Sequence, residues 1–390
     1  MLNAKNTAAG ILSALMACTG GAVLIISSAE AAGLTRPELV SWLFIVYVVG
    51  GLLNLLLSLI YRIPMAGAHS ITAVAFLSTA AAQYSLSELA GSFLMAGCLI
   101  AVLGFSGLLT RVFAWIPRPL LDAMLAGMIL HYVVGIVPAI QQSPVAGILA
   151  LAGFFLAPRI SRLIPPLLGV LAFGIAGLLI EYDFPALQAS SFTFPALIMP
   201  NFSVHGFFSL AVPIAVLILS NDVAVALAAL KKNGFQAPFN KLIGFSGFGT
   251  ALVSLFGGHA VNMGGMMTAL CSSEEAGPKE GRYKAAVVSG LLVALFGLFA
   301  WKVITVIELV PKSFIALITG FSLLSVLLNS LKSAFAEASY RYSVLFAFVI
   351  AISNVQVLGI SAAVWSLLIG TLAAKLLGED KTPGTASEGV

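Results

Sequence analysis

Asp222 is the residue of this sequence best placed to do chemistry. It stands in the run Leu219-Ser220-Asn221-Asp222, deep inside an apolar segment. A carboxylate at that depth costs roughly 2.5–3.5 kcal/mol on membrane-insertion scales, so we expect it to face a cavity and to have a role. Desolvation favours the protonated form of a carboxyl, which suits a group that binds and releases a proton in each cycle. We predict that Asp222 couples proton movement and that its neighbour Asn221 contacts substrate; the alternative is that Asp222 only hydrogen-bonds a broken helix.

Two histidines stand in similar surroundings, one in each half of the chain. Gly67-Ala68-His69-Ser70 and Gly257-Gly258-His259-Ala260 each open a short apolar run, and the two histidines are 190 positions apart (259 − 69). The alternative to a binding role is that these histidines only cap or bridge helices. The residues predicted here to contact substrate are His69, Ser70, His259 and Asn262.

No motif for a metal, a nucleotide or a redox centre accompanies these residues. The sequence contains no HExxH, no Walker loop, no GxGxxG after a strand and no CxxC. Its three cysteines lack paired spacing and are expected to act as small apolar residues. We therefore expect no cofactor, no metal and no enzymatic activity, because two histidines and one aspartate at these spacings match no catalytic motif.

The composition around these groups is that of a membrane protein. Of the 390 residues, 60% are hydrophobic and only 9% are charged, and the mean hydropathy is +1.07. A soluble domain carries about a quarter charged residues. The net charge of +4 comes from basic residues scattered singly between apolar runs, which indicates topology signals rather than a nucleic-acid partner. We predict an all-α, multi-pass protein of a bacterial inner membrane, with the lipid bilayer as its solvent.

Charge, proline and glycine divide the chain into about fourteen apolar segments, seven on each side of a less apolar linker. We predict a first repeat over 1–183, an extracytoplasmic linker over 184–205, a second repeat over 206–378 and a cytoplasmic tail over 379–390. The predicted spans are 8–28, 38–61, 70–82, 88–111, 119–136, 145–157 and 165–180 in the first repeat, and 206–230, 240–256, 260–272, 284–308, 312–330, 342–352 and 358–377 in the second.

The placement of basic residues supports this number of spans. With both termini in the cytoplasm, sixteen of the nineteen Lys and Arg residues fall on the cytoplasmic side, and only Arg36, Lys302 and Lys312 fall outside. This bias is the positive-inside rule. One missed or invented span would reverse the sides of every loop after it and destroy the bias.

The two halves are predicted to be inverted copies of each other. Ile116-Pro117-Arg118 precedes the fifth span and Val310-Pro311-Lys312 the twelfth, at nearly the same offset as the histidines. Because seven is odd, the second copy must enter the membrane upside down. The third and tenth spans have only about 13 residues, roughly 20 Å of helix against a hydrocarbon core of about 30 Å. We therefore expect two half-helices that follow extended lead-ins, and whose facing N-termini form an anion site.

Five stretches of the sequence carry a resemblance to a known family: Tyr61-Arg62-Ile63-Pro64, Ile116-Pro117 with Ala123-Met124-Leu125-Ala126-Gly127, Pro195–Ser203, Gly257-Gly258-His259-Ala260-Val261-Asn262, and Glu275-Ala276 with Pro278, Arg282 and Tyr283. In their order and spacing they resemble the benzoate:proton symporter family (BenE-type) along nearly the whole chain. The resemblance implies the fold shared by uracil permeases and sulfate-permease-type transporters: fourteen spans, a core domain that moves against a gate domain, and substrate held between spans three and ten. The position of Asp222 in the eighth span is similar to the place where nucleobase permeases carry an acidic residue, and the resemblance leaves a homodimer open.

Three departures from the family's pattern fall in the predicted site. His69-Ser70-Ile71-Thr72 stands where the family has Trp-Ser-Thr-Pro, Asp222 stands where it has Gln, and Met263-Gly264-Gly265-Met266 stands where it has Leu-Ala-Ala-Ile. An ionised Asp222 would repel benzoate, so either Asp222 is protonated when substrate binds or the substrate is not a carboxylate. We predict proton symport of a small aromatic carboxylate such as benzoate by alternating access. The alternatives are a same-fold transporter of a nucleobase-like neutral ring or an inorganic anion, and an anion channel.

Overall fold

A computed structural model describes residues 3–108, 117–161, 164–186, 192–355, 357 and 361–380. Over these residues the regular structure is entirely helical. Several sequence predictions lie outside the described residues: the tail beyond residue 380, the span ends at 109–111 and 358–360, Ile116 of the repeated motif, and the basic residues Arg111, Arg162 and Lys381.

Within the described ranges, each predicted span of the first half corresponds to a helix or to a run of adjoining helices. The first span begins as α1 (Ala4–Met16), passes through a π-helical turn η1 (Ala17–Gly21) and continues as α2 (Ala22–Ala31). The others are α3 (Arg36–Tyr61), α4 (Ile71–Ala80) with the 3₁₀ turn η2 (Ala81–Gln83), α5 (Leu86–Ser106), α7 (Arg118–Val134) with α8 (Ile136–Gln142), α9 (Pro144–Ile160) and α10 (Pro166–Glu181).

The second half repeats this order. Its first span is a continuous run of α11 (Val204–Gly206), η3 (Phe207–Ala211), α12 (Val212–Leu217), η4 (Ile218–Val223) and α13 (Ala224–Lys232), in which η3 and η4 are π-helical. The others are α14 (Phe239–Ser254), α15 (Gly265–Ser272), α16 (Tyr283–Leu298), α17 (Ala300–Glu308), α18 (Lys312–Ala334), α19 (Tyr342–Ser353) and α20 (Ala362–Leu376), with short turns η5 (Glu274–Ala276) and η6 (Lys279–Gly281) before α16. In the described part, seven segments are long and apolar enough to cross a membrane unaided.

The predicted span 284–308 is wrong as a single helix. The chain bends at Phe299, so that α16 ends at Leu298 and α17 is a separate helix. Polar residues Lys302, Thr305 and Glu308 recur along one side of α17. Arg36 at the start of α3 holds that side, through an ion pair with Glu308 (3.0 Å) and a hydrogen bond to Thr305 (2.7 Å). A helix with one polar side is stable where it lies along the edge of the bilayer rather than across it.

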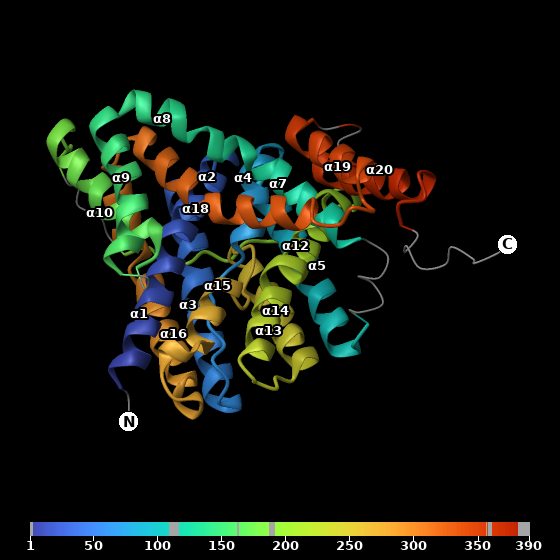
Figure 1. The fold of residues 1–390 in the computed structure, drawn as a ribbon, viewed down its shortest axis with the longest axis horizontal. Coiled ribbons are helices and arrows are strands. Elements are labelled where there is room, and N and C mark those ends of the chain that lie inside the picture. The colour runs from blue at the N-terminus through green and yellow to red at the C-terminus, as the bar shows by residue number, and fades with distance from the viewer. Residues whose placement is uncertain are drawn as a thin grey trace.

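The helices form two groups that each combine both halves of the chain. In one group, the core domain, α3 packs against α16 and α5 against α14. In the other, the gate domain, α7 packs against α18 and α19, while α9 and α10 form a hairpin next to α18. Figure 1 shows α7–α10 and α18–α20 along the upper edge, with α1, α3, α5 and α13–α16 below them. Because α3–α16, α5–α14, α7–α18 and α7–α19 each join the two halves, neither half forms a domain by itself.

Two glutamates at equivalent places show the internal repeat in atomic detail. The Glu181 carboxylate at the end of α10 accepts hydrogen bonds from the N–H groups of Val145 (2.8 Å) and Ala146 (3.1 Å), at the start of α9. The Glu379 carboxylate, after α20, accepts them from Tyr342 (2.9 Å) and Ser343 (3.1 Å), at the start of α19. Each acid lies at or just after the end of the last helix of its half. It caps the start of the preceding helix, where free N–H groups and the helix dipole favour a negative charge.

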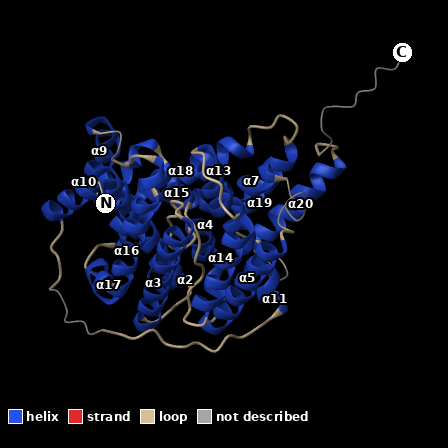
Figure 2. Ribbon diagram, turned by 90° about the horizontal axis from the view of Figure 1, so that it is seen from below, coloured by secondary structure: helices blue, strands red, loops and turns tan. Residues whose placement is uncertain are grey.

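The described parts of the connection from α10 to α11, residues 182–186 and 192–203, contain no regular structure. This connection runs along one end of the helical bundle (Figure 2). It is tied down by backbone hydrogen bonds, from Ile198 N–H to Leu255 C=O (2.8 Å) and from Asn201 N–H to Ser87 C=O (2.9 Å). These bonds fix it to the ends of α5 and α14 in the core domain.

Candidate functional site

Two extended segments cross in the core domain, and each leads into a short helix, as the sequence predicted. They are residues 63–70, which lead into α4, and 258–264, which lead into α15. Asn262 N–H donates to Ala68 C=O (3.2 Å), and Gly264 N–H donates to Ala66 C=O (3.0 Å). Gly67 allows this approach, because a Cβ there would lie 2.3 Å from the Asn262 carbonyl oxygen. The crossing therefore brings the starts of both half-helices together.

Both half-helices are too short to cross the bilayer. At 1.5 Å per residue, the 10 residues of α4 and the 8 residues of α15 span about 15 Å and 12 Å. Their first turns present backbone N–H groups that have no acceptor within the helix. Ser70 caps α4 by accepting a hydrogen bond from Ala73 N–H (2.9 Å), while Gly264 at the start of α15 has no side chain to do so.

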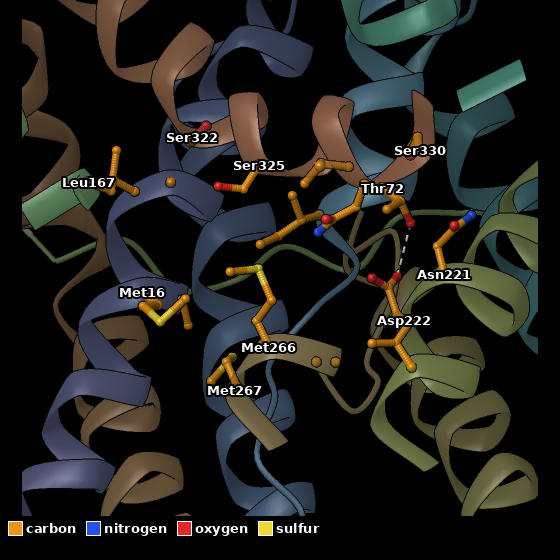
Figure 3. A pocket seen from close by; sticks show the side chains of 18 of the residues that line it. Met16, Thr72, Leu167, Asn221, Asp222, Met266, Met267, Ser322, Ser325 and Ser330 are labelled. Atoms are coloured by element: carbon orange, nitrogen blue, oxygen red, sulfur yellow. Dashed lines mark hydrogen bonds between the residues drawn. The ribbon is translucent and has the colours of Figure 1, made fainter. Parts of the chain in front are cut away.

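Asp222 is buried at the start of α4, although it belongs to a different span. Its carboxylate oxygen Oδ2 accepts hydrogen bonds from the Ser70 hydroxyl and from the Thr72 hydroxyl (3.0 Å). Only 8% of Asp222 is exposed, and the exposed part lines a cavity (Figure 3). The residue lies in the π-helical turn η4, and wider turns of this kind occur frequently at functional sites because they redirect side chains. Asp222 thus joins the eighth span to the third at the predicted site.

The two repeat histidines lie against each other, but their environments differ. The ring centroids of His69 and His259 are 5.1 Å apart. His259 is completely buried behind the cavity wall: Trp42 Nε1–H donates to its Nδ1 (2.9 Å), so Nε2 carries the proton and donates to Ser70 C=O (3.2 Å). Both of its nitrogens are therefore engaged within the protein, and the structure keeps His259 away from any ligand in the cavity.

His69 lines the cavity. Tyr47 uses its hydroxyl proton on Ala17 C=O (2.7 Å), so the contact between that hydroxyl and His69 Nε2 (3.1 Å) requires a proton on Nε2. The other nitrogen, Nδ1, is then an acceptor, and within the described residues it has no hydrogen-bond partner. His69 is the repeat histidine whose position fits a contact with substrate.

The two predicted asparagines also differ in position. Asn221 lines the cavity next to Asp222. Asn262 is fully buried inside the crossing, and its side-chain amide makes no hydrogen bond of normal geometry to the described residues. The structure therefore brings His69, Asn221 and Asp222 together at the cavity wall, with Ser70 directly behind them. His259 and Asn262 are buried around the crossing segments and do not line the cavity.

The cavity itself, of about 260 Å³, lies between the core and gate domains. The core domain contributes residues from η1, η4 and the starts of α4 and α15, and the gate domain contributes residues from α7, α9, α10 and α18. The first turns of α7 contribute the exposed Arg118 and the buried Asp122 to the cavity wall. The Asp122 carboxylate accepts a hydrogen bond from the hydroxyl of Ser333, which lies at the end of α18 and also lines the cavity.

The gate-domain wall of the cavity was not predicted from the sequence. Its residues include Phe154, Leu167, Phe321, Ser322 and Ser325. The signal that could have indicated part of this wall is the spacing of Ser322, Ser325 and Asn329, which places three polar side chains on one face of an apolar helix.

Comparison with known proteins agrees with this geometry. A family model described as benzoate membrane transport protein matches residues 2–376. The chain belongs to this family. It is 30% identical over 370 residues to the inner membrane protein YdcO of Escherichia coli (strain K12), covering 93% of each chain. It is 26% identical over 376 residues to a benzoate membrane transport protein of Acinetobacter baylyi, covering 95% of this chain and 94% of that protein.

Solved structures give the fold. The transmembrane domain of the cyanobacterial bicarbonate transporter BicA matches with a TM-score of 0.59 at 15% identity, covering 95% of this chain and 97% of that one. The structure of SLC26A9 matches with a TM-score of 0.62 at 15% identity, covering 95% of this chain and 65% of that one. These proteins have the seven-plus-seven inverted-repeat fold, which confirms the predicted fold class. This member of the benzoate transport family is therefore a multi-pass membrane transporter of the inner membrane.

Proposed function

We propose that this chain is a proton-coupled symporter that imports a small aromatic carboxylate such as benzoate by alternating access. The observation that carries the proposal is the position of Asp222. Its carboxyl group is held at the start of α4, lines the cavity and lies where the two half-helices meet. A substrate carboxylate drawn to the half-helix N-termini would come close to it, and two adjacent negative charges in a dry site repel each other. A proton on Asp222 removes that repulsion, so substrate and proton bind together.

The cavity's location between the two domains supports alternating access. Its lining includes residues at the start of α7, the start of α10 and the end of α18. In the orientation with cytoplasmic termini, Arg118 and Lys332 at these ends, and Arg159 at the end of α9, lie on the cytoplasmic side. The structure then corresponds to an inward-facing state from which substrate and proton are released. For coupling, only the doubly loaded or the empty core domain moves across the gate domain.

The test is uptake of radiolabelled benzoate into proteoliposomes with an imposed inward proton gradient. With one proton per substrate, a gradient of one pH unit supports about tenfold accumulation, because 1.36 kcal/mol per unit corresponds to a tenfold change. Asp222→Asn keeps the size of the side chain and an oxygen for the Ser70 and Thr72 hydroxyls, but it removes the titrating group. We expect this variant to bind or exchange substrate without accumulation.

The matched control is Asp122→Asn, which changes the other carboxyl group that lines the cavity. Asp122 lies in the gate domain and contacts Ser333, so we expect gradient-driven uptake to persist. Accumulation by the Asp222→Asn variant equal to that of the native chain would refute coupling through Asp222. Absence of benzoate uptake by the native chain, together with binding of a neutral ring such as uracil, would refute the proposed substrate.

A further inference from the structure

The gate helix α18 turns a polar face toward an otherwise apolar part of the cavity. Ser322, Ser325 and Asn329 all line the cavity, and their spacing of three and four residues places them on one side of the helix. Ser322 and Ser325 lie near the middle of α18, which runs from Lys312 to Ala334, whereas Asn329 is nearer its end. Polar groups at the middle of a membrane helix are costly unless they face a cavity and find a partner there.

Ser325 differs from Thr319 and Ser322 on the same helix because its hydroxyl is unused. Thr319 and Ser322 donate their hydroxyl protons to carbonyl oxygens of α18 itself, at Ile315 and Thr319 respectively (2.8 Å each). Ser325 makes no such bond, and no hydrogen bond joins its hydroxyl to any part of the chain that the structure describes. Its donor and its acceptor are therefore both available to a molecule in the cavity.

Ser325 and Asp222 lie on different sides of the cavity with apolar side chains between them. In Figure 3 the Ser325 hydroxyl lies above Met266 and well away from Asp222, Thr72 and Asn221, which gather at the other side. Met16, Leu167, Met266 and Phe321 line the cavity and provide thioether, aliphatic and aromatic surface for a ring. From Asp222 toward Ser325, the cavity thus offers a site for a carboxylate, an apolar section and a free hydroxyl.

Closure of the two domains around a substrate would remove the Ser325 hydroxyl from solvent. A buried hydroxyl without a partner is unfavourable, and a site built to hydrogen-bond a substrate hydroxyl discriminates against an analogue that lacks it. Benzoate offers only carbon and hydrogen on its ring, so it leaves Ser325 unpaired. We propose that the preferred substrate is a ring-hydroxylated aromatic acid whose meta or para hydroxyl bonds to Ser325, while its carboxylate lies beside Asp222. This inference rests on the proposed function and names the substrate class of the same site.

The experiment compares gradient-driven uptake of benzoate with that of its 2-, 3- and 4-hydroxy derivatives in proteoliposomes. We expect at least one of the 3- and 4-hydroxy acids to be taken up with about tenfold higher kcat/KM than benzoate, the effect of one well-placed hydrogen bond. The 2-hydroxy acid is the ligand control. Its hydroxyl lies beside its own carboxylate and bonds to it, so it cannot reach Ser325 and should show no such advantage.

Ser325→Ala should reduce the ratio of kcat/KM for the preferred hydroxy acid to kcat/KM for benzoate about tenfold. Ser322→Ala is the matched control, because it removes a hydroxyl from the same helix face that already bonds to its own helix; the preference should persist. Ser325→Thr retains a hydroxyl and should retain the preference, which guards against a general effect of substitution at this position.

Equal uptake of benzoate and all hydroxy acids by the native chain would overturn the inference while leaving the proposed function intact. A preference that survives Ser325→Ala, or a variant that loses benzoate and hydroxy acid equally, would overturn the role of Ser325. A native chain that transports none of these acids would refute the proposed function itself.

Discussion

Gly67 is the residue at which a single methyl group should do the most damage to the binding site. It lies where the lead-in to α4 crosses the lead-in to α15. A Cβ at this position would lie 2.3 Å from the Asn262 carbonyl oxygen, 2.5 Å from the Gly264 nitrogen and 2.8 Å from the Met263 Cα. All three atoms belong to the backbone, so no side chain can rotate away. Gly67→Ala must push the two lead-ins apart.

The expected cost follows from that displacement. To reach ordinary contact distances of 3.4 Å or more, the segments must separate by about 1 Å. The hydrogen bonds from Asn262 to Ala68 (3.2 Å) and from Gly264 to Ala66 (3.0 Å) would then lengthen to about 4 Å and be lost. Overpacking costs about 1–3 kcal/mol and each hydrogen bond about 0.5–1.5 kcal/mol, which gives about 2–6 kcal/mol in total. The half-helix starts would also no longer face each other correctly.

The assay is thermal unfolding in detergent together with uptake in proteoliposomes. We expect Gly67→Ala to lower the unfolding temperature clearly and to abolish uptake. Gly281→Ala is the control, because a Cβ at Gly281 meets only Asn6 side-chain atoms, at 3.7 and 3.9 Å. If Gly67→Ala unfolds and transports like the native chain, the crossing is not closely packed and our account of the site is wrong.

Two further predictions concern contacts outside the cavity. Trp42→Phe leaves the buried Nδ1 of His259 without its hydrogen-bond donor. The free energy of unfolding should therefore fall by about 1–3 kcal/mol, measured by thermal or denaturant unfolding. An unchanged stability would mean that this bond contributes nothing. For Glu379, burial alone would raise the pKa of the carboxyl, but hydrogen bonds from Ser343, Tyr342 and Arg341 outweigh it, so the pKa is lowered overall. Its contribution to stability is therefore present at neutral pH and lost as the pH falls through that lowered pKa. Glu379→Gln should lower the free energy of unfolding by at most about 1 kcal/mol at pH 7, since the site is partly exposed. The variant should also lose less stability than the native chain as the pH falls. An equal dependence of unfolding free energy on acid pH in both chains would contradict this.

Much of the fold could be predicted from the sequence because the signals involved are local. A run of apolar residues long enough for the bilayer forms a helix wherever it occurs, and basic residues stay on one side of the membrane. The shortness of the third and tenth spans indicated broken helices, and the structure has α4 and α15 there. The bend at Phe299 was missed because the residues before and after it are equally compatible with a helix. The contact of α17 with Arg36, which is far away in the sequence, is equally invisible to a local pattern.

The site was predicted in part, for the same reason. Its residues were found because polar groups inside apolar runs are conspicuous, but their orientation could not be read from spacing. His69 and His259 occupy equivalent positions in the two repeats, yet one lines the cavity and the other is enclosed by Trp42 and the Ser70 carbonyl. Ser325 was not predicted, because a serine in a membrane helix usually bonds to its own helix and gives no indication of facing a ligand.

By itself, then, the sequence determined that the chain spans the membrane, how many times it does so and that the third and tenth spans are short, because hydrophobic length, charge and glycine act within one segment. Only the tertiary structure decided which groups meet. Asp222 contacts Ser70 and Thr72 across some 150 positions of the chain, and α18 closes the cavity from the opposite domain. Such contacts depend on how two inverted halves interlock, and that packing is a property of the whole chain rather than of any segment of it.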